Sequence, residues 1–581
     1  MISQRHSWRM IILGLAALLT AVVSVLLTPP AIGYESSLFH AYHPLTWAAF
    51  AIAFVSLLTA ILAPHYRIRA IIGIGILYTV FLTLPAIRNY VLFATPQADI
   101  LFHMGIISDI ISEGRIPYLF YPAPHTLFST VLLITGLSDI MLQSISAITF
   151  TLILVSGIVL TTRRFLSSAV GPFILVAALP FVYGIHHISF HPWFFGLTLI
   201  PLLLFLNLIR DQARQWEMST MVLTIGAALI LYHILTAIVA VFIVVGLLVL
   251  RWLSQRHTSF PDLVAPTALA TALILWVVYL DRFEILVRRF FIAQLAPGGG
   301  VGYVTQAGST DRTLWQLLEL VFLQWGTVIL YSGLGSLIVF GLLLGWRKSN
   351  LYPFEHTVVT GFGIGVVFGS ALALAQVFAR NPLRILQFAL LFSIFLLGIA
   401  LWRVGRSETL AARVPKSGQT ALTAGIFVCI LITGLLGGAT LYPDHRHLTE
   451  TTVEGTAWHL DYHDRSQPTI SQHMAHNMEL YLSGYTDGRT TERVFYRHDS
   501  EVQLPNRLGY ANSTAVGEWA TDRYLLTKRE DRVWAASIPE NRKDDVDHYR
   551  LEDEARLADD SSVNRLYTNG EFQTWHTRGR R

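Results

Sequence analysis

Long apolar stretches separated by short polar segments occupy the chain as far as about residue 440, and the remainder is mostly polar. A helix needs about 20 apolar residues to cross the hydrocarbon core of a bilayer. Thirteen spans are predicted, over 9–28, 46–63, 70–92, 141–161, 168–184, 193–209, 218–232, 234–250, 262–280, 326–346, 356–378, 385–403 and 420–440. The pattern therefore predicts an α-helical polytopic membrane domain over 1–440 and a soluble domain over 441–581.

The distribution of basic residues supports this number of spans. Cytoplasmic loops of membrane proteins collect Lys and Arg. With a cytoplasmic N-terminus, every predicted inside loop is basic, whereas the first outside loop, 29–45, has no Lys or Arg. A single long span over 218–250 would place the basic segment 403–416 outside, so we divide it at the kink-prone pair Tyr232-His233. The layout predicts a multi-pass protein of the cell membrane whose C-terminal domain is extracellular.

The first large outside loop, 93–140, contains its own helical pattern. Thr95-Pro96 is typical of a helix start. The following segment, 97–113, has an apolar face made of Ile100, Met104, Ile107 and Ile111. Such a helix is expected to lie in the plane of the membrane interface. A short apolar segment, 124–137, is expected to lie against the membrane or dip into it.

A second outside loop, 281–325, contains three consecutive glycines and is predicted to be mobile. The soluble domain has patterns of short strands at 493–497, 524–527 and 533–537. The Asn569-Gly570 pair between two such patterns favours a hairpin. These features predict a small extracytoplasmic α/β domain.

Composition agrees with two parts in different solvents. Apolar residues make up 53% of the chain and charged residues 14%, against about 25% charged in soluble domains. The C-terminal 141 residues carry 24 acidic and 18 basic residues, while the preceding part carries 14 and 24. The basic residues of the membrane part lie in short loops, so they do not indicate nucleic-acid binding. The single cysteine, Cys429, excludes a disulfide within the chain.

Asp99 and His103 are the first candidates for chemistry. Asp99 lies in the first turn of the predicted helix, where the helix dipole favours an ionised carboxylate. A carboxylate at the membrane surface can take the proton of an acceptor hydroxyl as a general base. His103 follows four residues later on the same face. The alternative is that Asp99 only stabilises the start of the helix.

Two arginine pairs lie in predicted outside loops, against the positive-inside trend. They are Arg380 with Arg384, and Arg288 with Arg289. Arginine can hold a phosphate group by paired hydrogen bonds. The alternative is contact with lipid headgroups.

Tyr121, His125 and His233 are further candidates. Prolines fix the turn that contains Tyr121 and His125, so His125 can line a site or cap the next helix. His233 belongs to a group of histidines at outside loop ends whose spacing matches no closed metal site. We therefore expect neither a metal nor a cofactor.

These features together resemble the GT-C superfamily, membrane glycosyltransferases that use polyprenyl-phosphate-linked sugars. The strings DILFHMG at 99–105, GRIP at 114–117 and YPAPH at 121–125 are similar to the first outside loop of archaeal members. The ending NRLYTNGEF at 564–572 is also similar to archaeal proteins of this kind.

The resemblance implies an inverting hexosyltransferase with Asp99 as general base. Arg380 and Arg384 would hold the lipid phosphate, and loop 281–325 would close over the donor. The implied donor is a polyprenyl (dolichyl) phosphate sugar, and the implied acceptor is a protein, lipid or glycan at an archaeal cell surface, as in protein glycosylation.

Two departures narrow the resemblance. The oligosaccharyltransferase branch has a Trp-Trp-Asp-Tyr-Gly motif, whereas the nearest string in this chain is WHLDYH at 458–463. That branch also has a second acidic residue in its first loop, and Asp109, ten residues after Asp99, does not match its spacing. These departures favour a metal-independent transferase of single sugars.

Two other classes of protein compete with this interpretation. A transporter or lipid-linked glycan flippase would place ionisable residues near the midplane of its spans, whereas these spans are nearly free of charge. A receptor or assembly factor would account for the outer domain but not for the first outside loop.

Overall fold

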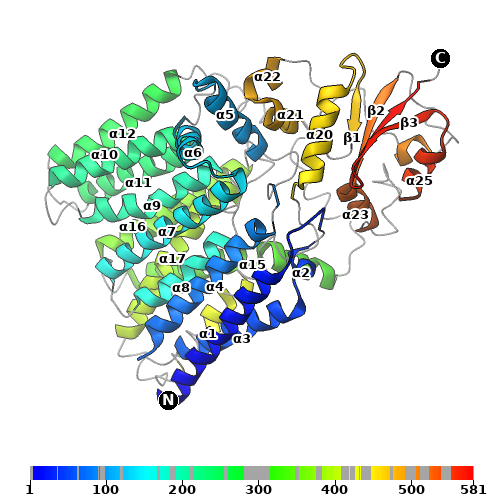
Figure 1. Ribbon diagram of the computed structural model, residues 1–581. Helices are drawn as coiled ribbons and strands as arrows, with labels where there is room; N and C mark the ends of the chain where they lie inside the picture. Colours follow the sequence, from blue (N-terminus) through cyan, green and yellow to red (C-terminus); the bar gives the residue numbers. More distant parts are fainter. Residues whose placement is uncertain are drawn as a thin grey trace.

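The computed structural model describes residues 4–35, 37–61, 65–88, 90–91, 99–117, 122–166, 170–183, 191–209, 215–253, 260–279, 314–346, 352–374, 383–406, 418, 425–430, 432–433, 447–471, 476–490, 506–510, 522–537 and 551–579. They form a helical bundle and, at one end of it, a smaller domain with a sheet (Figure 1). The N-terminus lies at the end of the bundle away from the sheet (Figure 1).

Twelve of the thirteen predicted spans coincide with helices. These are α1 (Gln4–Leu27), α3 (Pro44–Ile61), α4 (Arg67–Ile87), α7 (Asp139–Phe165), α8 (Gly171–Tyr183), α9 (Pro192–Ile209), α10 (Gln215–Tyr232), α11 (Ile234–Leu253), α12 (Phe260–Tyr279), α15 (Leu314–Trp346), α16 (Pro353–Leu374) and α17 (Leu383–Arg406). The thirteenth, 420–440, lies mostly outside the described residues.

Five of the described helices are long and apolar enough to cross a membrane. They contain the segments Arg5–Leu27, Pro44–Ile61, Met141–Phe165, Pro192–Ile209 and Gln387–Val404. Shorter apolar helices cover Ile68–Phe81, Thr236–Gly246, Leu263–Tyr279 and Ile329–Leu344. The mostly helical, multi-pass architecture is confirmed, while the total of thirteen spans stays a prediction.

The predicted division between α10 and α11 is confirmed. His233 is the single non-helical residue between them. Its backbone N–H donates to Leu229 and its carbonyl accepts from Ala237, at 2.9 and 3.0 Å. The Nδ1 atom of His233 faces the backbone N–H of Thr236 at 3.4 Å, so this side chain helps to cap the start of α11.

The bundle has a buried centre and an open outer side. In α17, every side chain from Gln387 to Ile399 is buried, so this helix is apolar and enclosed all round. α1 packs along α3 and exposes Leu19 and Leu27. Exposed apolar side chains along a helix of this length are suited to contact with lipid.

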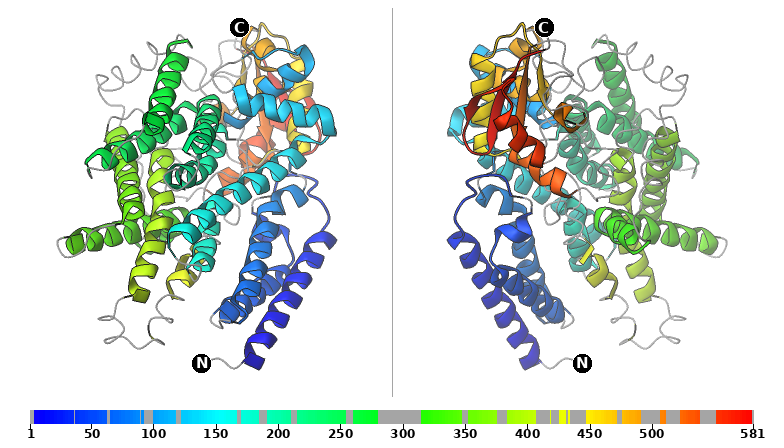
Figure 2. Two further views of the ribbon diagram at one scale, coloured as in Figure 1. Left: turned by 90° about the vertical axis from the view of Figure 1, so that its left-hand side faces the viewer. Right: turned by 90° about the vertical axis from the view of Figure 1, so that its right-hand side faces the viewer.

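Two helices of segment 93–140, the predicted first large outside loop, join the bundle to the smaller domain. α5 (Asp99–Glu113) and α6 (Pro122–Thr135) confirm the predicted helix 97–113 and the apolar segment 124–137 as helices. α5 packs on α6 and also on α21 (His476–Ser483) and α22 (Tyr485–Thr490) of the smaller domain. Figures 1 and 2 show α5 between the bundle and these two helices.

The surroundings of α5 correct the expectation of a single apolar face, while its place in the membrane interface stays a prediction. Ile100, Met104 and Ile107 are buried in the large hydrophobic cluster that runs through the bundle and also includes Met478 of α21. Ile106, on another side of α5, is buried in a second cluster with Leu480 and Tyr485. The expectation was wrong because the sequence pattern does not show that a distant segment covers this second side.

The smaller domain contains a four-stranded sheet in the order β1-β2-β4-β3. β1 (Thr469–Ser471) is parallel to β2 (Arg523–Lys528), while β3 (Val563–Thr568) and β4 (Phe572–Thr577) continue the sheet in antiparallel fashion. The strand predicted at 524–527 and the hairpin around Asn569-Gly570 are confirmed. Gly570 has a φ of 92°, which is typical of this turn pair.

Helices cover the sheet. They are α20 (Glu450–Tyr462), α23 (Arg529–Ser537) and α25 (Leu551–Asp559). The 3₁₀ turn η2 (Asn506–Gly509) adds Leu508 to the core of this domain. The short helix α2 (Leu38–Ala41), in segment 29–45, lies below the domain in Figure 1. The strand predicted at 533–537 is wrong, because these residues form the last turns of α23. Asp531 accepts the backbone N–H of Lys528 at 3.2 Å and so favours a helix start. The strand predicted at 493–497 lies outside the described residues.

Candidate functional site

Asp99 is the first residue of α5. The N-terminus of a helix has backbone N–H groups without intrahelical partners and a positive dipole end. This position therefore suits a carboxylate. The structure places the backbone of Asp99 at the start of this helix. Its role as general base stays a prediction.

His103 and His125 form a buried pair between α5 and α6. The Nδ1 atom of His103 lies 3.0 Å from the Nε2 atom of His125, and the two side chains are 6% and 0% exposed. A hydrogen bond between two imidazoles requires one nitrogen to donate and the other to accept. The pair can therefore hold and pass on a proton one turn beyond Asp99.

The structure joins these two candidates, which the sequence had placed in separate motifs. His125 is predicted either to line a site or to cap a helix, and its ring faces His103 within the first turn of α6. Ser129 of α6 continues the contact between the two helices, since its hydroxyl donates to the carbonyl of Ile107 in α5 at 3.4 Å. His103 thus lies on the bundle side of α5.

A row of aromatic rings connects α6 with α9, α7 and α10. Phe128 stacks on Phe195 at 5.3 Å, and Phe195 stacks on Phe150 at 4.1 Å between ring centroids. Phe150 in turn meets Tyr232 edge-on at 6.3 Å. His233 follows Tyr232, so the structure connects it to the His125 helix through this aromatic row.

The predicted phosphate-binding arginines are not placed by the described residues. For Arg384, the structure places the backbone, as the second residue of α17. Arg380, Arg288, Arg289 and Tyr121 lie outside the described residues. Their roles stay predictions.

Among the residues that the structure describes, no cluster of side chains suits a metal ion. No group there of three or more His, Cys, Asp or Glu side chains is able to hold a metal ion. The expectation of a metal-independent reaction stays a prediction, because part of the chain lies outside this description.

A buried ion pair, which the sequence interpretation missed, lies where the first outside loop meets the C-terminal domain. Arg88, at the end of α4, pairs with Glu35, and Tyr90 donates a hydrogen bond to the same carboxylate. His447, just before α20, stacks on Tyr90 with ring centroids 3.8 Å apart. Burial, together with the hydrogen bond to Glu35, raises the pKa of Tyr90 above its usual value.

One sequence signal for this contact exists. Glu35 is the only charged residue in loop 29–45, and an isolated acid in a predicted outside loop calls for a partner if it is buried. The partner Arg88 lies 53 residues away, at the far end of a predicted span, and spacing alone does not connect them.

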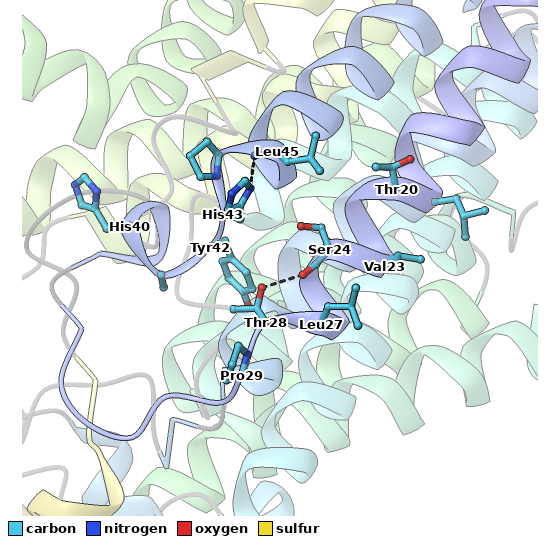
Figure 3. Close-up of a pocket in the computed structure, with 13 residues that line it drawn as sticks. Thr20, Val23, Ser24, Leu27, Thr28, Pro29, His40, Tyr42, His43 and Leu45 are labelled. Atoms are coloured by element: carbon cyan, nitrogen blue, oxygen red, sulfur yellow. Dashed lines mark hydrogen bonds between the residues drawn. The ribbon is translucent and has the colours of Figure 1, made fainter.

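A groove of about 890 Å³ lies between the ends of α1 and α3 on the side of the smaller domain (Figure 3). Leu19, Val23 and Leu27 line its apolar part, while Thr28 and His43 lie among its polar residues. The hydroxyl of Thr28 donates to the carbonyl of Ser24, and the ring of His43 accepts from the N–H of Leu45 (Figure 3). No Lys or Arg is among the lining residues, so the groove suits a hydrocarbon chain better than a phosphate group.

No protein-family model matches the chain, and no curated protein matches it. Among solved structures, the chain is similar to the crystal structure of ArnT from Cupriavidus metallidurans bound to undecaprenyl phosphate. The two are 12% identical, with a TM-score of 0.48, over 88% of this chain and 98% of that one. ArnT from the same organism in the apo state gives the same identity and coverage with a TM-score of 0.37. Neither structure supplies a role for a residue of this chain.

Proposed function

We propose that this protein is a membrane glycosyltransferase that moves a sugar from a polyprenyl phosphate to an acceptor hydroxyl on the outer face of the cell membrane. The observation that carries the proposal is the position of α5. This helix begins with Asp99 and contains the buried His103–His125 contact. It lies where a bundle of apolar helices meets a water-exposed domain, so both a lipid-linked donor and a soluble acceptor have access to its surroundings.

The proposed reaction needs a base and an anion-binding group. Asp99 accepts the proton of the acceptor hydroxyl, whose oxygen attacks the anomeric carbon of the sugar. The bond from that carbon to the phosphate oxygen breaks, and the configuration is inverted. The leaving lipid phosphate keeps the bonding electron pair, and Arg380 and Arg384 stabilise its negative charge.

The finer assignments form part of the same proposal. They are a dolichyl phosphate donor, a single hexose, an acceptor on a protein, lipid or glycan of an archaeal cell surface, and no bound metal. Arg288 and Arg289 assist in holding the donor. They belong to the predicted loop 281–325, whose bounds were wrong at one end, because residues from Leu314 onward form α15. The N-terminus faces the cytoplasm and the C-terminal domain faces outward.

Replacing Asp99 with Asn in the native host tests the proposal. Cell-surface glycans of this variant are compared by mass spectrometry with those of the wild type and of a deletion strain. We expect the variant to lose the same sugar as the deletion strain while reaching the membrane in normal amount.

Glu113→Gln is the matched control, because it removes a carboxylate from the other end of α5. Glu113 pairs only with the exposed Arg115 beside it in the described structure, so its loss should leave the glycans unchanged. A deletion strain with an unchanged glycan profile would contradict the transferase and favour the transporter alternative. If the glycan profile changes in the deletion strain but not in the Asp99→Asn variant, the role of Asp99 as base is contradicted.

A further inference from the structure

The C-terminal domain contacts the helix that begins with Asp99 at very short range. At Gly105, in the middle of α5, an added β-carbon would lie 2.1 Å from the carbonyl oxygen of Leu480 in α21. The backbones of the two helices therefore touch. Glycine is the residue that allows such an approach, because any side chain would separate the helices.

Asp109 makes the polar part of this contact. Its carboxylate accepts the backbone N–H of Tyr485 at 3.1 Å and both the N–H and the hydroxyl of Thr486 at 2.7 Å. The side chain is 4% exposed. The two N–H groups belong to the first turn of α22 and have no partner within that helix, so Asp109 supplies the acceptor that they need.

Further side chains strengthen the same contact. Phe102 meets Tyr485 edge-on, with ring centroids 5.3 Å apart. Gly484, with a φ of +85°, makes the turn before α22, and a β-carbon there would lie 2.1 Å from the Asp109 carboxylate. Tyr481 of α21 is partly buried and packs against the large hydrophobic cluster.

The bundle holds another side of α5 through Met104, Ile107 and the His103–His125 hydrogen bond. The position of α5 is thus determined by both parts of the molecule. Asp109 lies ten residues after Asp99, which corresponds to about 15 Å along a straight helix. A tilt of α5 at Asp109 would consequently move its first turn.

We propose that Asp109 is a positioning residue whose hydrogen bonds to α22 set the position of the first turn of α5, and with it Asp99. The C-terminal domain then forms part of the transfer machinery as the support of the catalytic helix. This inference rests on the proposed function. Asp109 itself does not touch the substrate in this proposal.

The test compares Asp109→Asn with Asp487→Asn in the full-length protein. Asp487 is an exposed acid of the same helix α22, so the control makes the same chemical change one residue after Thr486. Each variant is expressed in the deletion strain, whose membranes contain the acceptor. Initial rates of sugar transfer are measured against added lipid extract from that strain, which supplies the unused donor.

For Asp109→Asn we expect the maximal rate to fall by roughly 10-fold to 100-fold, as small displacements of reacting groups do. The donor concentration at half-maximal rate should stay the same, because donor contacts are unchanged. Hydrogen exchange measured by mass spectrometry should become faster in both α5 and α22. Thr486→Val, which removes the hydroxyl hydrogen bond to Asp109 and keeps the two backbone N–H donors, provides a milder version if Asp109→Asn fails to accumulate.

Faster exchange with an unchanged transfer rate would overturn the positioning role. Unchanged exchange and an unchanged rate would show that Asp109 does not hold α5. An equal loss in Asp487→Asn would also contradict the proposal. If wild-type membranes transfer no sugar, the proposed function fails, and the exchange measurement still decides whether Asp109 fastens α5 to the domain.

Discussion

The outer side of α1 and the junction around α5 are both apolar, but they are built differently. Leu19 and Leu27 of α1 are 65% and 78% exposed. Ile100 and Ile106 of α5 are both 0% exposed, and they belong to two different hydrophobic clusters. One helix thus presents its apolar side chains to its surroundings, while the other is enclosed by protein.

The difference shows what each solvent demands of a sequence. Lipid tails accommodate any apolar side chain, so α1 needs only sufficient length and hydrophobicity. A junction between two protein surfaces needs close packing and satisfied polar groups. It therefore depends on particular residues, such as a glycine at 105 and a carboxylate at 109.

The largest expected effect concerns the ion pair beside the junction. Arg88→Ala leaves the carboxylate of Glu35 without its cation in a largely buried place, and removing one partner of a buried pair costs about 3–5 kcal/mol. Arg88 is 5% exposed, whereas Arg115, which pairs with Glu113, is 65% exposed. Arg115→Ala is the control and should cost about 0–1 kcal/mol. Thermal unfolding in detergent micelles measures both, and equal shifts would contradict the comparison.

The next effect is a pH dependence of the C-terminal domain. Burial, with a contribution from neighbouring His463, lowers the pKa of His459 to about 3. An unfolded histidine titrates near 6.5, so the unfolded state binds more protons below that pH and the folded state loses stability as pH falls. At pH 5 the loss is about 2 kcal/mol, from about 1.4 kcal/mol per pH unit.

Hydrogen exchange at pH 7 and pH 5, corrected for the intrinsic rate of exchange, checks this prediction. Amides of α20 and of the side of α5 that contacts α21 and α22 should lose protection together, while those of α1 should not. The pH dependence should disappear in His459→Gln. Its persistence in that variant would assign the effect to another group.

An effect of similar size is expected from glycines in two helices. Gly105→Ala introduces a β-carbon against the backbone of Leu480, which cannot move aside as a flexible side chain can, so the cost lies at the upper end of the range for overpacking, about 3 kcal/mol. The better helix propensity of alanine returns about 1 kcal/mol, so the net loss is about 2 kcal/mol. Gly75 in α4 has nothing within 4 Å of such a carbon, and Gly75→Ala should stabilise the helix. If Gly105→Ala and Gly75→Ala shift the melting temperature in the same direction, this contrast is contradicted.

The smallest effect should come from the lipid-facing side. Leu19→Ala shortens a side chain that is already 65% exposed, and lipid fills the space that it leaves. We expect a change within about 0.5 kcal/mol, as for ordinary exposed positions. Thermal unfolding in lipid nanodiscs measures this change in stability. A loss as large as that of a buried core residue would show that protein, and not lipid, fills the groove beside α1.

The sequence by itself determined most of the secondary structure of this protein. Runs of apolar residues located twelve helices, because length and hydrophobicity suffice for a segment in lipid. The break at His233 and the hairpin at Asn569-Gly570 were also predictable, since local backbone preferences produce them. The helix predicted over 97–113, observed from Asp99 to Glu113, was predictable from its period of 3.6 residues.

Only the tertiary structure decided what surrounds these elements. The sequence assigned residues 533–537 to a strand, but the acidic first turn of α23 and its packing on β2 make them helical. It treated Asp109 as an acid at the wrong spacing, whereas its partners Tyr485 and Thr486 lie about 376 residues away in the chain. His103 and His125 became a pair for the same reason. Periodicity reports what a segment does with its neighbours in sequence, and contacts between distant segments follow from the packing of the whole chain.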